Sequence, residues 1–160
     1  MASRPGLDGC SEAFAAAVCA MSAPMLITDA GEPDHPIVFV NDAFCRMTGY
    51  ARADIIGRNC RFLQGADKDP ITVAAIRTAI ALERSVEADI LNYRRNSEPF
   101  WNRLLILPVR DETGWVSHFV ANPVDVTTER AWPADLQNHN AARTVRPACG
   151  AKPGASRSEP

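Results

Sequence analysis

The sequence predicts one α+β domain, flanked by an extension at each end. Two short apolar segments come first, helical patterns follow, and three longer alternating segments close the patterned part of the chain. Strands on either side of a group of helices are typical of the α+β class, in which helices gather against an antiparallel sheet. The length of 160 residues suits one such domain with tails.

Composition and charge disfavour several other classes of protein. The formal net charge is only −2, so neither nucleic acid nor an anionic membrane is expected as the main partner. No apolar run approaches the roughly 20 residues that span a bilayer, and Glu12 precedes the small apolar run at 13–20, unlike a signal peptide. We therefore expect a cytoplasmic protein. Its cysteines form no C-x-x-C pair and are expected to be reduced, without a metal; they are Cys10, Cys19, Cys45, Cys60 and Cys149.

The N-terminal extension is expected to contain a helix over 11–20, with Ser11 as its N-cap. Phe14 and Val18 lie four residues apart and share one face of this helix. That face needs a partner, which is either the domain that follows or a second copy of the chain. A homodimer through the terminal helices is therefore one expectation.

The first half of the domain is interpreted as two strands followed by short helices. The strands are expected at 25–29 and 37–40, on either side of a turn rich in Pro, Gly and Asp. Asn41 suits the N-cap of a short helix that Gly49 ends. One more helical turn is expected at 51–56.

The main helix is expected to begin after Asp69, which suits the N-cap, with Pro70 in the first helical position. Its apolar side chains are Ile71, Val73, Ile76 and Ile80. Arg77 lies beside this apolar stripe. An arginine in such a place usually extends its guanidinium to water, and it could instead reach an anion.

The three alternating segments after the main helix predict three antiparallel strands. The residues expected to share one face of each are Val86, Ala88, Ile90 and Asn92, then Phe100, Asn102, Leu104 and Ile106, and last Trp115, Ser117, Phe119, Ala121 and Pro123. Asn92 and Asn102 thus lie on neighbouring apolar faces. Buried amides must be hydrogen-bonded, so they either satisfy each other or bind a heterocycle with alternating donors and acceptors. Because there are two, beside an unusual polar segment, we favour the heterocycle.

That polar segment is 57–65, which places a thiol, two cations, two side-chain amides and two apolar groups between glycines. Such a mixture does not suit a plain core helix, because buried cations and amides need partners. The run Asn-Cys-Arg-Phe-Leu-Gln at 59–64 resembles the signature of LOV (light-oxygen-voltage) domains, the flavin-binding blue-light sensors of the PAS superfamily. Cys60 alone would be interpreted as a buried structural cysteine; the motif around it favours a functional role.

The resemblance covers about 24–128 and implies the PAS fold, a five-stranded antiparallel sheet with helices on one face. It divides the chain into an N-terminal extension at 1–23, this flavin-binding domain, and a C-terminal extension at 129–160. Beyond Arg130 the chain loses its periodicity and becomes rich in Pro, Ala, Arg and Ser. Such a composition is typical of disordered segments, so the C-terminal extension is expected to be largely disordered.

The resemblance also implies roles for single residues. In LOV domains blue light drives a reversible bond between a cysteine thiol and carbon C4a of bound FMN, and the matching thiol is that of Cys60. Arg61 and Arg77 would hold the ribityl phosphate, because forked guanidinium donors match phosphate oxygens. The other implied contacts are Asn59 and Gln64 at the ribityl chain and ring edge, Asn92 and Asn102 at the pyrimidine edge, and Leu26, Thr28, Leu63, Ile80, Leu104, Ile106 and Phe119 along the ring.

Two positions depart from the LOV pattern. Most LOV domains have a glutamine on the last strand that faces flavin N5 and O4 and relays its protonation, and the matching residue here is Pro123. Proline sits badly in a central strand; a bulge would accommodate it and would turn Asn122 inward. His35 takes the place of an asparagine found in many relatives, and we interpret it as a surface loop residue.

These expectations describe a short LOV photoreceptor without a fused enzyme, which signals to an unknown effector protein through its flanking helices or a dimer contact. An alternative is a PAS-type flavin redox sensor. A thiol enzyme would need a base near Cys60, and the three histidines His35, His118 and His139 have no recognisable partner motif. The chain is therefore not expected to be an enzyme.

Overall fold

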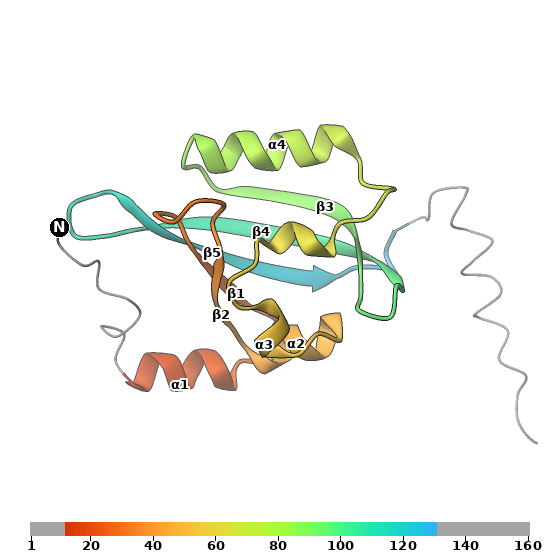
Figure 1. The fold of residues 1–160 in the computed structure, drawn as a ribbon, viewed down its shortest axis with the longest axis horizontal. Helices are drawn as coiled ribbons and strands as arrows, with labels where there is room; N and C mark the ends of the chain where they lie inside the picture. The colour runs from red at the N-terminus through yellow and green to blue at the C-terminus, as the bar shows by residue number, and fades with distance from the viewer. Residues whose placement is uncertain (1–11, 131–160) are drawn as a thin grey trace, which may run out of the picture. The chain divides into compact units, whose positions relative to one another are not determined.

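The computed structural model describes residues 12–130 and has the expected α+β architecture (Figure 1). Its first helix, α1, spans Glu12–Ala20. Ser11, the expected N-cap of this helix, and the C-terminal segment 131–160 lie outside the described residues. Within 12–130, no helix is long and apolar enough to cross a membrane.

The predicted five-stranded antiparallel sheet is confirmed. In chain order its strands are β1 Leu26–Asp29, β2 Ile37–Val40, β3 Val86–Tyr93, β4 Pro99–Arg110 and β5 Val116–Asp125. Their order in space is β2-β1-β5-β4-β3. The last strand therefore lies in the middle of the sheet and joins the first half of the chain to the second.

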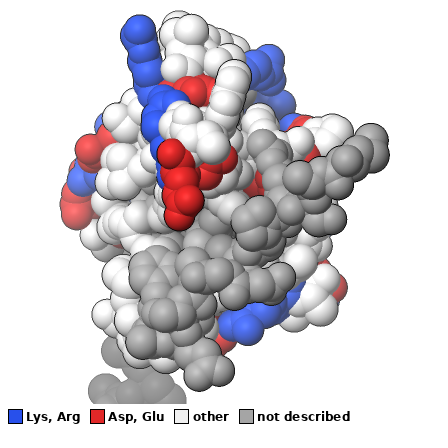
Figure 2. Space-filling model, turned by 90° about the vertical axis from the view of Figure 1, so that its left-hand side faces the viewer, with Lys and Arg blue, Asp and Glu red and all other residues white. Residues whose placement is uncertain are grey.

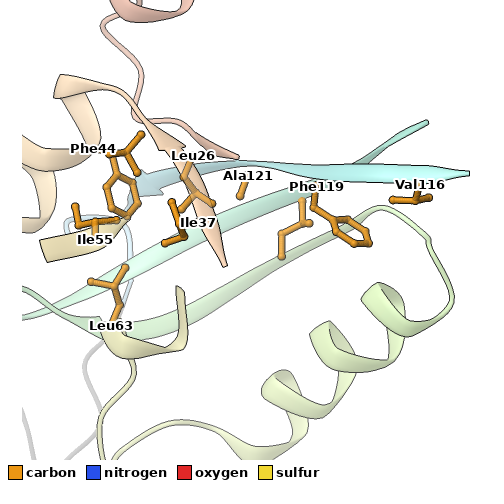
Figure 3. Close-up of a cluster of buried hydrophobic side chains, with 10 residues drawn as sticks. Leu26, Ile37, Phe44, Ile55, Leu63, Val116, Phe119 and Ala121 are labelled. Atoms are coloured by element: carbon orange, nitrogen blue, oxygen red, sulfur yellow. The ribbon is translucent and has the colours of Figure 1, made fainter. Parts of the chain in front are cut away.

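The helices after β2 pack on the sheet through one buried cluster. They are α2 Asp42–Thr48, α3 Arg52–Ile55, the 3-10 helix η2 Cys60–Leu63, and α4 Pro70–Ala81. Phe44, Ile55 and Leu63 lie in this cluster with Leu26 of β1 and Phe119 of β5 (Figure 3). Fully burying a side chain of this size contributes about 1.5–3 kcal/mol, so packing on the sheet stabilises helices that are too short to form alone.

Three helix ends predicted from the sequence, at Asn41, Gly49 and Asp69, are confirmed. Asn41 Oδ1 accepts a hydrogen bond from Phe44 N at 3.1 Å at the start of α2. Gly49 ends this helix with a φ of 77°, a left-handed conformation that glycine adopts without steric cost. Asp69 caps α4 by accepting from Thr72 N at 3.1 Å.

Asn41 also ties the end of α1 to the domain. Its Nδ2 donates to Ala23 O at 2.8 Å, and its Oδ1 accepts from Met25 N at 3.0 Å. Val18 of α1 is buried, while the side chain of Phe14, expected to share its face, lies outside the described residues. The segment that enters β1 is therefore held by a fully buried amide rather than by the helix alone.

The expected face of β5 is correct over its second half and wrong at its start. Phe119, Ala121 and Pro123 are buried as predicted, but Trp115 is 70% exposed and precedes the strand. The pairing between β4 and β5 is irregular after Val109, so Val116, not Ser117, is buried in the core. A bulge inverts the alternation of faces along a strand, which the period-two pattern did not anticipate.

Pro123 causes no bulge. The pairing of β5 with β4 is regular on both sides of the Leu104–Pro123 pair. Val126 N donates to Trp101 O, which fixes the alternation of this antiparallel ladder and turns the nitrogen of residue 123 away from β4, toward β1. The pairing of β1 with β5 ends at Leu26 and Ala121. Pro123 therefore lies two pairs beyond the end of that ladder, where its missing N–H breaks no ladder hydrogen bond.

Asn122 does not turn inward either. Its Nδ2 donates to Pro24 O at 2.7 Å. In the register of β1 and β5, Pro24 lies opposite Pro123, so its carbonyl would be the acceptor for a backbone N–H at 123. The side chain of Asn122 supplies the donor that Pro123 lacks.

Candidate functional site

A cavity of about 350 Å³ lies between the sheet and the segment from η2 to α4. This volume falls in the range of small-molecule sites. Every residue that the resemblance implicates in cofactor contact lines it: Leu26, Thr28, Asn59, Cys60, Arg61, Leu63, Gln64, Arg77, Ile80, Asn92, Asn102, Leu104, Ile106, Phe119 and Pro123. The fold brings them together at one place, and their individual roles stay predictions.

The thiol of Cys60 stands at the first position of η2 and lines this cavity. Burial raises the pKa of the Cys60 thiol, which its backbone hydrogen bond and the Arg61 guanidinium only partly offset. The thiol is therefore neutral at physiological pH. A nucleophilic cysteine enzyme needs the opposite shift, toward a thiolate.

The helix that carries Cys60 is fixed on several sides. Asn59 caps it by accepting from Arg61 N at 2.9 Å. The ring of Phe62 packs edge-on against Tyr50, with a centroid distance of 5.0 Å. After the helix, a Cβ on Gly65 would lie 2.2 Å from a ring carbon of Tyr93, so any larger residue here would require the Tyr93 ring to move.

The two strand asparagines form the polar wall of the cavity. Asn102 Nδ2 donates to Asn92 Oδ1 at 2.9 Å, and Asn92 Nδ2 donates to Leu91 O at 3.1 Å. The pair thus satisfies itself in part, but Asn102 Oδ1 is buried without a hydrogen-bond partner. An unsatisfied buried acceptor costs about 1–3 kcal/mol, and a ligand with an N–H at this wall would remove that cost.

The cationic residues of the cavity differ in their partners. Arg61 donates to Asp34 Oδ2 at 2.6 Å, and this hydrogen bond raises the pKa of Arg61. Arg77, on α4, makes no ion pair with any residue in 12–130. One of the two arginines predicted to bind an anion is therefore free to do so, and the other is held by a loop carboxylate.

The interpretation of His35 as a surface residue is wrong. Its ring lines the cavity, packs edge-on against Phe119 at 5.7 Å between centroids, and has a buried Nδ1 without a partner. Asp34 also lines the cavity, and the φ angles of Asp34 and His35 are 70° and 45°. Asp and His are among the non-glycine residues that tolerate positive φ best, so the Asp-His pair in a turn was the available signal for this reversal of the chain.

Comparison with known proteins assigns the family. A family model described as PAS domain matches residues 22–128. A blue-light-activated histidine kinase of Brucella anthropi is 48% identical over 132 residues, which are 82% of this chain and 27% of the kinase. The solved LOV domain of the blue-light-activated histidine kinase of Erythrobacter litoralis is 42% identical with a TM-score of 0.65, over 67% of this chain and 98% of that domain. The chain is a LOV domain of the PAS superfamily.

The relatives also show what the chain leaves uncovered. It spans less than a third of the curated kinases that it matches, 27% in one and 30% in others. The light-state dimer of the fungal photoreceptor Vivid is 34% identical with a TM-score of 0.64, over 66% of this chain and 78% of that protein. This LOV domain thus corresponds to a blue-light sensing module. Related domains occur in histidine kinases and in Vivid, a photoreceptor solved as a light-state dimer.

The site of this LOV domain fits a flavin. The isoalloxazine ring is flat, largely apolar, and polar along its pyrimidine edge. The cavity provides apolar walls, and the unpartnered Asn102 Oδ1 can accept from an N–H at that edge. The two arginines among the lining residues suit an anionic tail.

Proposed function

We propose that this LOV domain binds FMN and uses Cys60 as the thiol of a reversible, blue-light-driven bond to the flavin. The observation that carries the proposal is a neutral, half-buried thiol on the same cavity as an unpartnered amide acceptor. The bound flavin supplies light absorption and the reactive carbon. The chain holds the ring, keeps water from it, and fixes the thiol on a short helix.

FMN is proposed over other flavins because of charge. Arg61 and Arg77 can together neutralise one terminal phosphate, which riboflavin lacks. Both arginines line the cavity, and nothing among the lining residues suggests a second site for an adenine. The cofactor released from the purified protein should therefore be mainly FMN by chromatography, and FAD as the main species would contradict this.

The test of the photochemistry is one absorption spectrum before and after blue light. The parent protein should be yellow and should bleach reversibly. Cys60→Ala should keep the colour and lose the bleaching. Cys45→Ala is the matched control, because Cys45 is a free cysteine on α2 that does not line the cavity.

If Cys60→Ala still formed the thiol bond, Cys60 would not be the photoactive residue. If the parent bound flavin but responded to reductant and not to light, the alternative of a redox sensor would replace this proposal.

The proposed output is a change in the flanking segments or in a contact between two copies of the chain, transmitted to a separate effector protein. Pro123 lacks the amide through which a glutamine would relay the event. Asn122 provides a different connection, because it lies beside Pro123 in β5 and its amide donates to Pro24 O, in the segment between α1 and β1. We propose that the chain itself is a sensor and performs no enzymatic reaction.

A further inference from the structure

The cavity wall contains one carboxylate beside its two arginines. The charged side chains that line the cavity are Asp34, Arg61 and Arg77. Asp34 Oδ2 lies 2.6 Å from Arg61 Nη2, and both side chains are more than half exposed, at 55% and 58%. An exposed ion pair of this kind stabilises the fold weakly, so a competing anion can replace the carboxylate.

We propose that Asp34 is a specificity-determining residue of the cofactor site: a built-in competitor for the cofactor's phosphate, which occupies Arg61 and makes the site tolerant of flavins without a phosphate. The proposal rests on the proposed function, because it concerns the phosphate of the same cofactor. It assigns to Asp34 a role opposite to that of the arginines.

The charge of the site supports this role. Arg61 and Arg77 alone would present two positive charges to a phosphate dianion. With Asp34 paired to Arg61, the three lining side chains have a net charge of +1. A dianion is therefore undercompensated, whereas riboflavin, which is neutral, is unaffected by the carboxylate.

Hydrogen bonds to backbone groups hold the loop that contains Asp34, so its carboxylate can separate from Arg61 while the loop keeps its conformation. Asn59 Nδ2 donates to the backbone carbonyl of Asp34 at 2.6 Å, a bond that does not involve the carboxylate. The loop is also joined to the segment before η2 by Ile37 N, which donates to Arg58 O at 2.8 Å. The carboxylate can thus leave Arg61 while the chain around it stays in place.

The variant Asp34→Asn isolates the charge. Asparagine is the non-glycine residue best suited to positive φ, so it accepts the φ of 70° at this position. It also keeps the backbone carbonyl that Asn59 binds. Asp42→Asn is the matched control. Asp42 Oδ1 forms an ion pair with Arg52 Nη2 at 2.7 Å, and neither residue lines the cavity.

The experiment measures the affinities of cofactor-free protein for FMN and for riboflavin by calorimetry. The interaction between two unit charges a few ångströms apart in water changes a binding affinity by roughly a factor of five. Asp34→Asn should therefore raise the preference for FMN over riboflavin by roughly three- to tenfold, and this gain should shrink as salt is added. Asp42→Asn should leave the preference unchanged.

An unchanged preference in Asp34→Asn overturns the proposal. A reduced preference also overturns it, since Asp34 would then hold Arg61 in place for the phosphate. If Asp34→Asn does not fold, Asp34→Gly gives the same test, because glycine adopts positive φ freely. A parent protein that binds neither flavin would refute the proposed function itself, which this measurement shows separately from the effect of Asp34.

Discussion

At the scale of single residues, the site shows polar groups that the folded protein leaves unsatisfied. Asn102 Oδ1 and His35 Nδ1 are buried without partners on one cavity. Buried polar groups in folded proteins are nearly always paired, so two exceptions at one place indicate a ligand. The sequence predicted only one of the two: Asn102 was expected to face the site, and His35 was not.

A prediction at this scale concerns Asn102→Leu. The change removes the unpartnered oxygen of Asn102, but it also removes the donor to Asn92 Oδ1, which is then left unpaired. A gain and a cost of similar size oppose each other, so the free energy of unfolding of cofactor-free protein should change by no more than about 1 kcal/mol. The affinity for flavin should fall by about tenfold or more, because the polar wall loses its acceptor. Urea unfolding and flavin titration measure the two effects.

Asn96→Leu is the control for this variant, since Asn96 lies in the exposed turn between β3 and β4 and is not part of the cavity lining. Severe destabilisation of Asn102→Leu without flavin would show instead that the amide pair serves the core.

At the scale of elements, local chemistry in the sequence determined most of the helix ends and strands. Asn41, Gly49 and Asp69 act at the positions expected of them, because caps and left-handed turns depend on a few neighbouring residues. The predicted face of β5 was wrong at its start, because the irregularity after Val109 depends on how β4 and β5 pair. No pattern within β5 encodes it, and so Val116 replaced Ser117 on the buried face.

In the site, too, the sequence could place residues that belong to a local pattern but not contacts between distant segments. The residues of the 59–64 motif and the two strand amides could be placed from the motif and from alternation. The pairing of Arg61 with Asp34 could not, because it joins residues 27 positions apart through a reversal of the chain. The tolerance of Pro123 depends on where β1 ends, which the residues around Pro123 do not reveal.

A prediction for the element α4 concerns pH. The hydroxyl of Thr72 and the backbone N–H groups of Ile71 and Thr72 donate to Asp69 and lower the pKa of its carboxyl group. A carboxyl with a lower pKa in the folded state stabilises the protein above its unfolded pKa, and this contribution is lost as the pH falls through the folded pKa. Asp69→Asn keeps a capping oxygen but does not titrate. Its free energy of unfolding should therefore fall less steeply between about pH 5 and pH 2 than that of the parent.

Denaturant unfolding at a series of pH values measures this difference. Equal slopes for parent and variant would mean that the cap does not contribute to the acid response.

At the scale of the whole domain, charged residues are distributed without a dominant sign. Figure 2 shows basic and acidic side chains close to one another on one face. Several charged residues of the domain form ion pairs, such as Arg110 with Glu83 at 3.1 Å. Exposed pairs of this kind contribute little to stability. The two halves of the domain are joined instead by β5, which pairs with both β1 and β4. The same strand contributes Phe119, Ala121 and Pro123 to the cavity wall.

A prediction at this scale concerns Asn122→Ala. Loss of the bond to Pro24 O should increase hydrogen exchange in 12–25 in the dark and should reduce the light-minus-dark difference there. Bleaching of the flavin should be unaffected, because Asn122 does not line the cavity. Asn96→Ala is the control. A full light response of 12–25 in Asn122→Ala would show that the signal leaves the site by another route.

The facing prolines at the end of the β1–β5 ladder have a consequence for any attempt to redesign this sensor. Neither Pro24 nor Pro123 has a backbone N–H, so neither can donate a ladder hydrogen bond to the other, and the backbone pairing of β1 with β5 does not continue through this pair. Any motion of the preceding segment then has its pivot where side-chain amides hold the chain: Asn122 donates to Pro24 O, and Asn41 donates to Ala23 O. Installing a glutamine at 123 would do more than restore a missing amide to the cavity. It would create a backbone donor that competes with Asn122 for the Pro24 carbonyl, and the pivot itself would move.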